Sequence, residues 1–363
     1  MNVIIFIIIL AILILVHEFG HFIVAKKSGI KVSEFGLGFP PKLWGIQKGE
    51  TLYSINAIPF GGFVKIFGED PDEESISGPD SGRSIVNKPR YIQAAVLIAG
   101  VTFNVIFAWL LISSGYVVGL PAPTDYSGPG IVENPHLIIT GVTPGSPAAI
   151  AGVKTGDTVV GVSSGKLTTK TLAPDVISNF VEAQGHNHIT LNVDRGTQPL
   201  TFDLVPAQGV IAGKLAIGIG MDSIGTLHLP FYLAFWEGAK TTWQTLVATA
   251  TGLLAFIGTA FQGHADLSQI TGPVGIVGLV GDVTHLGFVY LISFTAIISL
   301  NLAVINILPF PALDGGRLVI VAIEAIIRKP INPKISNRLN QIGFALLIAL
   351  MVVVTVHDVW KLF

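Results

Sequence analysis

The sequence contains no cysteine and little charge. Only 12% of its 363 residues are Asp, Glu, Lys or Arg, whereas 50% are hydrophobic. An average soluble domain carries about 25% charged residues, so this composition favours a membrane location. Without cysteine, disulfides and thiolate metal ligands are excluded, and a metal could bind only through His, Asp or Glu. The net charge of -2 and the lack of a long basic block indicate no nucleic-acid partner.

Four long apolar segments are predicted to cross a bilayer as helices. They are Val3 to Ala25, Tyr91 to Leu120, Gly287 to Pro309 and Gln341 to Val356. A span needs about 20 apolar residues, which the last segment reaches with its flanking residues. Nothing basic precedes the first segment, so we expect a retained helix and not a cleaved signal peptide.

The placement of positive charge predicts the sidedness of these helices. Of 21 Lys and Arg residues, nine lie between Lys26 and Arg90, and five lie between Arg317 and Arg338. Cytoplasmic connections carry the excess of basic residues, so both of these connections are predicted to be cytoplasmic. Residues 229–262 are ambiguous, because Glu237 and other polar residues interrupt their first half. We expect an amphipathic helix there, lying on the outer membrane surface.

A soluble domain is predicted at residues 128–210, in an outer connection. Alternation of apolar and polar residues predicts three short strands, at Leu137–Val142, Val159–Val162 and Ile189–Val193. Between them, VTPGSPAAIAGVKTGD places Pro and Gly at turns and starts a helix at Ser146, and a second helix is expected over Asp175–Gln184. This pattern resembles a PDZ domain of the bacterial protease type, which binds an extended peptide along a sheet edge. The alternative is a small β-domain without a peptide-binding role.

The pattern His17-Glu18-Phe19-Gly20-His21 lies inside the first apolar segment. Residues four apart share one face of a helix, so both imidazoles can reach one ion. In zinc hydrolases with this HExxH spacing, the glutamate takes a proton from the attacking water. Each ionisable residue would cost about 2.5–3.5 kcal/mol at the centre of a membrane helix, which favours a functional site over a structural His/Glu cluster. His17 lies about 21 Å along the helix from Val3, in the cytoplasmic third of the bilayer.

A third ligand is predicted in the segment Asn306-Ile-Leu-Pro-Phe-Pro-Ala-Leu-Asp-Gly-Gly316. Pro309 and Pro311 cannot continue a regular helix, and irregular backbone at membrane depth is tolerated only where it is buried or lines a wet cavity. Asp314 is the only carboxylate of this segment and can supply an oxygen ligand. Alternatively, Asp314 caps the N-terminus of the helix that follows.

Together these motifs resemble the site-2 protease family, in its bacterial branch with a single PDZ domain. The resemblance extends over nearly the whole chain and includes Gly36–Pro41, Ile58–Lys65 and Thr271–Ile276. It implies a polytopic α-helical membrane protein of a bacterial plasma (inner) membrane, with about four transmembrane helices and an inserted extracytoplasmic PDZ (α+β) domain. It also implies a membrane-reentrant β-hairpin over Tyr53–Lys65 that pairs with unwound substrate; the alternative is an ordinary cytoplasmic hairpin.

The resemblance further assigns the domains and the site. The expected domains are a protease core in two parts, the PDZ domain and the surface helix, at 1–120, 263–363, 128–210 and 229–262. One Zn²⁺ would bind to His17, His21 and Asp314, close to the cytoplasmic side, with Glu18 as the general base. Substrate would contact Asn306, which holds its backbone or the developing oxyanion, and also Pro309, Pro311, Gly61 and Gly62. Many relatives carry Tyr where this chain has Phe63, so Phe63 is left out of the site.

The implied activity is hydrolysis of peptide bonds within or near transmembrane segments of single-span membrane proteins, such as anti-sigma factors or remnant signal peptides. Two other readings compete with it. A membrane-bound PDZ adaptor would retain the helices without chemistry. A metal transporter would offer ligands along a path across the bilayer, and the outer halves of the four segments offer none. The remaining polar candidates are expected to be surface or loop residues: His186, His188, His264, Asp266, Asp282 and His285.

Overall fold

The computed structural model describes all residues except 170, 212–213, 264–270 and 361–363. Its described chain divides into two compact units. The helical unit comprises Met1–Ile112, Glu237–Val280 and Phe294–Phe363, and the β-domain unit comprises Ser113–Trp236 and Gly281–Ser293. His264 and Asp266 lie outside the described residues, as does the side chain of His285, whereas His186, His188 and Asp282 are exposed as expected.

Long helices account for most of the helical unit. Its elements are α1 (Asn2–Lys27), β1 (Val32–Lys48), β2 (Thr51–Ile66), α2 (Glu73–Ser77), 3₁₀ turns at Ser81–Arg83 and Ile85–Asn87, α3 (Arg90–Val118), α6 (Phe231–Phe261), α7 (Pro273–Leu286), α8 (Phe288–Asn306), α9 (Asp314–Ile327) and α10 (Pro333–Trp360). The ends of α3, α6, α7 and α8 belong to the other unit. Helices α1, α3, α8 and α10 confirm that the four apolar segments are helical.

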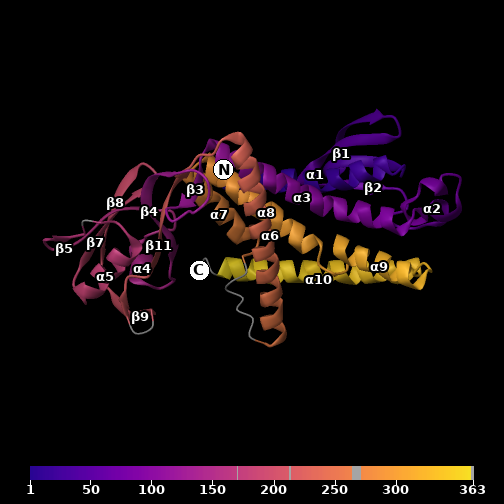
Figure 1. Ribbon diagram of the computed structural model, residues 1–363. Helices are drawn as coiled ribbons and strands as arrows, with labels where there is room; N and C mark the ends of the chain where they lie inside the picture. The colour runs from indigo at the N-terminus through magenta and orange to yellow at the C-terminus, as the bar shows by residue number, and fades with distance from the viewer. Residues whose placement is uncertain (170, 212–213, 264–270, 361–363) are drawn as a thin grey trace. The chain divides into compact units, whose positions relative to one another are not determined.

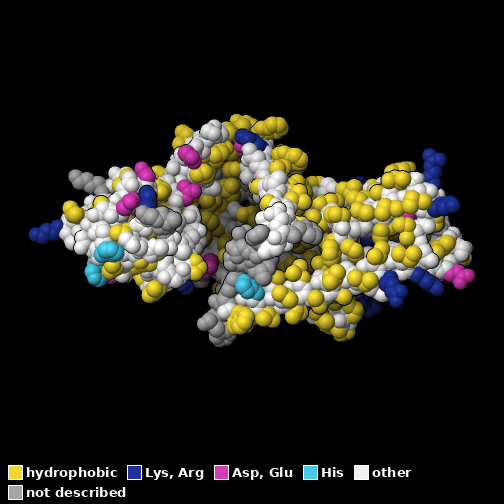
Figure 2. Space-filling model, turned by 90° about the horizontal axis from the view of Figure 1, so that it is seen from below, with side chains coloured by type: hydrophobic (Ala, Val, Ile, Leu, Met, Phe, Trp, Pro, Cys, Tyr) yellow, Lys and Arg dark blue, Asp and Glu magenta, His cyan; other side chains and the backbone are white. Residues whose placement is uncertain are grey.

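Among the described residues, five helices are long and apolar enough to cross a membrane: α1, α3, α6, α8 and α10. The mean hydropathy of α6 is 1.2, against 2.2 to 2.9 in the other four. On the face of the helical unit that Figure 2 shows, most side chains are hydrophobic, and Lys and Arg side chains gather at the end where α9 meets α10. A surface of this kind suits helices that face lipid.

Small residues bring α1 and α3 together. A Cβ added to Gly20 of α1 would lie 2.5 Å from the carbonyl oxygen of Ala99 in α3. Apolar helices in lipid pack closely where glycine removes the side chain from the contact. This contact places α3 directly against the face of α1 that carries the histidines.

Strands β1 and β2 form a sheet that packs on α1. Residues 34–37 of β1 lie between two segments of β2. On one side they pair with residues 62–65, whose numbering runs in the opposite direction, and on the other side with residues 52–55, whose numbering runs in the same direction. Residues 42–48 of β1 pair with residues 51–56, again in the opposite direction. The predicted hairpin over Tyr53–Lys65 is therefore wrong in its pairing, because its two arms pair with β1 and not with each other. The chain reverses between Leu37 and Lys42, at Gly49, and again between Asn56 and Gly62. Gly49 has φ +64, which glycine adopts without steric cost.

Aromatic contacts attach this sheet to the first helix. Phe22 of α1 lies 5.1 Å from Phe35 of β1 and 6.0 Å from Tyr53 of β2, measured between ring centroids. Phe19 contacts Phe103 of α3 at 5.9 Å. A buried apolar cluster continues below these rings, from Ala25 through Val64 to Val96. The sheet is thus held beside the helical turn that carries the HExxH pattern.

The β-domain unit contains strands and two short helices. They are β3 (Leu120–Pro123), β4 (Val132–Val142), α4 (Pro147–Ala151), β5 (Thr158–Ser164), β6 (Leu167–Thr168), α5 (Pro174–Gln184), β7 (Ile189–Arg195), β8 (Gln198–Leu204), β9 (Ala207–Ile211), β10 (Lys214–Ala216) and β11 (Ile219–Leu227). The larger sheet has the order β3-β11-β4-β5-β7-β8, with β6 paired to β5 (Figure 1). Its core is apolar, with Ile139, Ile177 and Leu191 fully buried.

The three predicted strands lie within β4, β5 and β7, and both predicted helices are present. Ser146 caps α4 by accepting a hydrogen bond from the backbone N–H of Ala149, as its position before the helix predicts. The sheet extends beyond residues 128–210 on both sides, because β3 precedes that range and β11 follows it. Strand β11 pairs with β4 along nearly its whole length, so it is an integral part of the sheet.

Candidate active site

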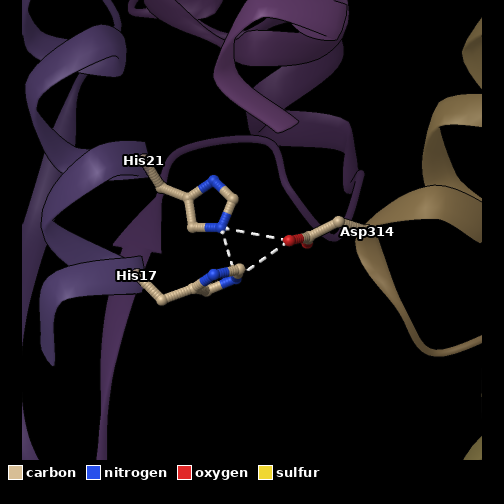
Figure 3. Close-up of side chains that lie close together, drawn as sticks. All are labelled: His17, His21 and Asp314. Atoms are coloured by element: carbon tan, nitrogen blue, oxygen red, sulfur yellow. Dashed lines mark hydrogen bonds and ion pairs between the residues drawn. The ribbon is translucent and has the colours of Figure 1, made fainter. Parts of the chain in front are cut away.

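Two imidazoles and one carboxylate converge between α1 and α9. The Nε2 atom of His17 lies 2.9 Å from Oδ2 of Asp314, and Nε2 of His21 lies 3.3 Å from the same oxygen. The two Nε2 atoms are 3.1 Å apart. Figure 3 shows the histidines projecting from one helix towards Asp314 at the start of another. The four-residue spacing thus places both rings on one face of α1, as predicted, and 297 positions separate His17 from its carboxylate partner.

The turn before α9 holds Asp314 in this position. Helix α8 ends at Asn306, and Leu313 occupies the N-cap position of α9, so Asp314 is not the cap. A Cβ on Gly315 would collide with the carbonyl oxygens of Ile307 and Leu308, and Gly316 has the same relation to Phe310. Only glycine allows the turn to fold back so closely on α9.

Helix α3 forms the wall behind the histidines. Nδ1 of His21 lies 2.8 Å from the carbonyl oxygen of Val96, which can only accept a hydrogen bond. A Cβ on Gly100 would lie 2.7 Å from Cε1 of both His17 and His21, so the rings rest directly on the backbone of α3. Nδ2 of Asn104 lies 3.4 Å from Nδ1 of His17. Sequence analysis gave α3 no role, although Asn104 stands out as an amide within an uncharged apolar segment.

The donor set fits a zinc ion. Zinc in proteins binds His nitrogen and Asp oxygen, and a catalytic site commonly has three protein ligands and one open position. The three ligand atoms form a triangle with edges of 2.9, 3.1 and 3.3 Å. A tetrahedral site with bonds of about 2.0 Å has edges of about 3.3 Å. The Val96 carbonyl favours the Nδ1–H form of His21, which leaves its Nε2 lone pair free for an ion.

A cavity of about 720 Å³ opens at this cluster. His17, Glu18, His21 and Asp314 all line it, so the glutamate shares one space with the three candidate ligands. The carboxylate of Glu18 also interacts with the backbone of Val64 in β2. Asn306, Pro309, Pro311, Gly61 and Gly62 are not among the described residues that line the cavity.

Ion pairs tie the walls of the cavity together. Arg317 of α9 pairs with Glu69, which follows β2, and Arg90 at the start of α3 pairs with Glu324 of α9 at 2.7 Å. At the end of α1, the Glu50 carboxylate accepts hydrogen bonds from Lys26 and from Arg83, both at 2.7 Å. These two bonds hold the pKa of the Glu50 carboxyl below its ordinary value.

Strand β2 approaches the site from the side. A Cβ on Gly61 would lie 3.0 Å from Cδ1 of Ile14, less than one turn before His17 on α1. The neighbouring Phe63 stacks its ring on Phe39 at 6.3 Å and covers Gly36, so it packs on the sheet. Residues 58–66 pair with β1 on one side only among the described residues.

The comparison with known protein families identifies the family to which this chain belongs. The family described as "Peptidase family M50" matches residues 5–350. The chain belongs to peptidase family M50, the family of the site-2 proteases. The resemblance found in the motifs is thereby confirmed, and the protein is a multi-pass membrane protein and a zinc metalloprotease that acts in intramembrane proteolysis.

Relatives of full length support this assignment. Two proteins named "Putative zinc metalloprotease", from Nostoc sp. and Clostridium perfringens, are 34% and 36% identical to this chain. The alignments cover 100% and 96% of this chain, and 97% and 95% of those proteins. "Zinc metalloprotease RasP" of Geobacillus kaustophilus is 29% identical, over 100% of this chain and 98% of its own length.

Proposed function

We propose that this protein hydrolyses peptide bonds within or near the transmembrane segments of single-span membrane proteins, with one Zn²⁺ held by His17, His21 and Asp314. The observation that carries the proposal is the convergence of these three side chains, within 3.3 Å of one another, at a cavity that Glu18 also lines. A membrane-bound adaptor would have no use for such a cluster. A transporter would need further ligands across the bilayer, and among the described residues only these three form a group able to hold a metal.

Each residue has one task in the proposed reaction. Zinc, when bound, supplies a Lewis acid that polarises the scissile carbonyl group and lowers the pKa of water to about 7. Glu18 takes the proton from the attacking water and delivers it to the leaving nitrogen. Its position between the two histidines on α1 fixes its carboxylate at the same end of the cavity as the ligands. Asn306, at the end of α8, holds the substrate backbone or the developing oxyanion.

The free edge of residues 58–66 offers a place for the substrate backbone. A helical substrate hides its carbonyl groups in its own hydrogen bonds, and unwinding it in lipid leaves those groups unpaired. Pairing with an exposed strand edge restores the lost bonds. Gly61 and Gly62 keep this edge free of side chains, and Gly61 already lies against α1 beside the site. Pro309 and Pro311, which precede Asp314, are the further residues that we propose to contact the substrate.

The site itself supports a topology of four spans, α1, α3, α8 and α10, in a bacterial plasma membrane. Asp314 meets His17 and His21, so the end of α8 lies at the same depth as the cytoplasmic end of α1. A spanning α6 would reverse α8, since α7 has only 14 residues and a span needs about 20. We therefore place α6 on the outer surface. Its exposed aromatic side chains, Phe231, Tyr232, Trp236 and Trp243, suit the headgroup region.

The β-domain is proposed to be an extracytoplasmic PDZ domain that contacts a peptide or a substrate segment. Its short capped helix α4, its longer helix α5 and its antiparallel sheet support this assignment. The domain either captures an extended peptide or admits only substrates with small outer domains. In both cases the substrates of the protease are shortened membrane proteins, such as anti-sigma factors or remnant signal peptides.

The test uses the purified protein and a panel of single-span substrates. Cleavage is expected with zinc, is lost with a chelator and returns when zinc is added back. Glu18→Gln abolishes cleavage and retains zinc, whereas Glu73→Gln, which changes an exposed carboxylate in α2, cleaves like the wild type. Cleavage that persists in Glu18→Gln would overturn the proposed mechanism.

A further inference from the structure

Helix α9, which carries Asp314, buries little apolar surface. The structure describes all of its residues, and those that are buried are Gly315, Gly316 and Glu324. Its apolar side chains are half-buried or exposed, and Ile326 near its end is 81% exposed. Helices in proteins are held in place chiefly by an apolar face that packs on a core. Apolar packing therefore fixes α9 less firmly than a core helix, and other contacts set its position.

Two ion pairs hold one face of α9. Arg317 pairs with Glu69, and Glu324 pairs with Arg90 at 2.7 Å. Arg317 and Glu324 are seven residues apart, which is about two helical turns, so their side chains lie on the same face of the helix. All four residues line the cavity that opens at the metal cluster. The two ion pairs thus connect α9 with other parts of the cavity wall.

The two pairs lead to different parts of the helical unit. Glu324 reaches Arg90 at the start of α3, the helix behind the histidines. Arg317 reaches Glu69, three residues after the end of β2. Arg317 is also the nearer of the two to the metal cluster along α9, because it follows Asp314 by three residues, just under one turn. The Arg317–Glu69 pair therefore connects the third candidate ligand with the strand that we propose to pair with substrate.

The backbone that carries Glu69 is well anchored. The N–H of Phe67 donates to the carbonyl oxygen of Lys31 at 2.9 Å, and the carbonyl oxygen of Phe67 accepts from the N–H of Ile85 at 2.9 Å. The N–H of Glu69 donates to the carbonyl oxygen of Ile66, the last residue of β2, at 3.1 Å. Backbone hydrogen bonds thus extend the order of β2 as far as Glu69. A movement of α9 relative to this strand would strain the ion pair.

We propose that Arg317 and Glu69 are positioning residues: their ion pair holds α9 at a fixed distance from residues 58–66, so that Asp314 and the substrate backbone meet at the same zinc ion. This inference rests on the proposed function. The pair acts through Asp314 and takes no part in the chemical step. Without it, α9 keeps its link to α3 and loses its link to the strand that binds substrate.

The first test measures cleavage of a single-span substrate by Glu69→Gln and by Arg317→Gln. Each change removes one charge of the pair. We expect kcat to fall by at least about tenfold, because a misplacement of about 1 Å far from the chemistry can cost about 100-fold in rate. KM should change little, because the edge of residues 58–66 stays free. A kcat within about threefold of the wild type in both variants overturns the inference, because it leaves no misplacement to explain.

Glu50→Gln is the matched control. Glu50 also pairs with an arginine, Arg83, and its side chain is 28% exposed, against 33% for Glu69. Its ion-pair partners, Lys26 and Arg83, lie outside α9. The kcat of Glu50→Gln is therefore expected to equal that of the wild type, and an equal loss in this variant would overturn the inference.

The double variant Glu69→Gln/Arg317→Gln separates a lost link from a stray charge. If the link matters, the second substitution adds no further loss, because residues that act as a pair are not additive. Recovery of kcat towards the wild-type value would overturn the inference. It would show that the unpaired Arg317 charge, and not the missing link, caused the loss in Glu69→Gln.

A readout on the metal alone distinguishes positioning from a general loss of stability. Zn²⁺ has a filled d shell and gives no visible spectrum, so Co²⁺ is bound in its place. The visible absorption of Co²⁺, which reports the arrangement of its ligands, is expected to change in Glu69→Gln and Arg317→Gln and to stay unchanged in Glu50→Gln. An unchanged spectrum in the first two variants overturns the inference. If the wild type itself binds no metal or cleaves no substrate, the proposed function fails and takes this inference with it.

Discussion

A carboxylate in each unit, Asp157 in the β-domain and the half-buried Asp314 in the helical unit, has partners of a different kind. In the β-domain, Asp157 is 1% exposed and both of its oxygens accept hydrogen bonds from Arg195, at 2.7 and 2.8 Å, with a further bond from the backbone N–H of Lys154. In the helical unit, the ion pairs of Asp314 with described residues go to His17 and His21, whose ring nitrogens also face each other. A carboxylate neutralised by a guanidinium holds structure together. A carboxylate that shares a small volume with two imidazoles is arranged to bind an ion that enters that volume.

The largest expected effect comes from Asp314→Asn, which removes the anionic ligand while keeping the shape of the side chain. Zinc affinity should fall by at least about 100-fold, more than the loss of an outer-shell partner, and cleavage should be lost with it. Metal content after gel filtration and cleavage of a single-span substrate measure the two effects. A variant that retains zinc at wild-type affinity would remove Asp314 from the site.

The opposite result is expected for Asp157→Asn, the matched change in the β-domain. Breaking a buried ion pair costs about 3–5 kcal/mol, and we expect about 2–4 kcal/mol because one third of the Arg195 side chain is exposed. Chemical unfolding of the full-length protein measures the loss, while zinc affinity should not change. Loss of zinc in this variant would break the distinction between structural and functional carboxylates.

Gly100→Ala should cost about 1–3 kcal/mol, because the added Cβ pushes against both histidine rings. It should also weaken zinc binding, since the rings must move. Gly161→Ala in β5 is the counterpart, because its Cβ would meet only Nδ2 of Asn192, at 3.7 Å. Thermal unfolding with and without zinc distinguishes the two variants. Equal shifts of the unfolding temperature in the two variants, both with and without zinc, would show that α3 does not form the wall of the site.

The smallest effect is expected from Glu50→Gln, at less than about 1 kcal/mol, because the ion pairs of Glu50 are partly exposed. The folded-state pKa of Glu50 is lowered, so its contribution is present above the ordinary value of 4.5 and is lost as the pH falls through the folded pKa. Stability curves of wild type and variant should thus converge below pH 4.5. If the difference in the free energy of unfolding between wild type and variant stayed constant down to strongly acidic pH, the ion pairs of Glu50 would not be its source.

Local patterns were sufficient to predict the helices, three strands of the β-domain and the convergence on Asp314. The HExxH spacing fixes a helical face, and the two prolines before Asp314 fix where α8 ends. Contacts between distant segments carry no such local signal. The pairing of β2 with both sides of β1 could not be read from alternation, which is the same for either partner. Nor could the contact of Asn104 with His17, because it depends on how closely Gly20 and Gly100 let two helices approach.

The order of the ligands along the chain has a consequence for biosynthesis. His17 and His21 leave the ribosome with the first helix, and Asp314 follows 297 positions after His17. During most of its own synthesis the chain therefore carries an incomplete set of ligands. The nascent protease acquires its third ligand only after α8 has been inserted in the correct orientation, so metal uptake reports that assembly in the membrane has reached its final stage.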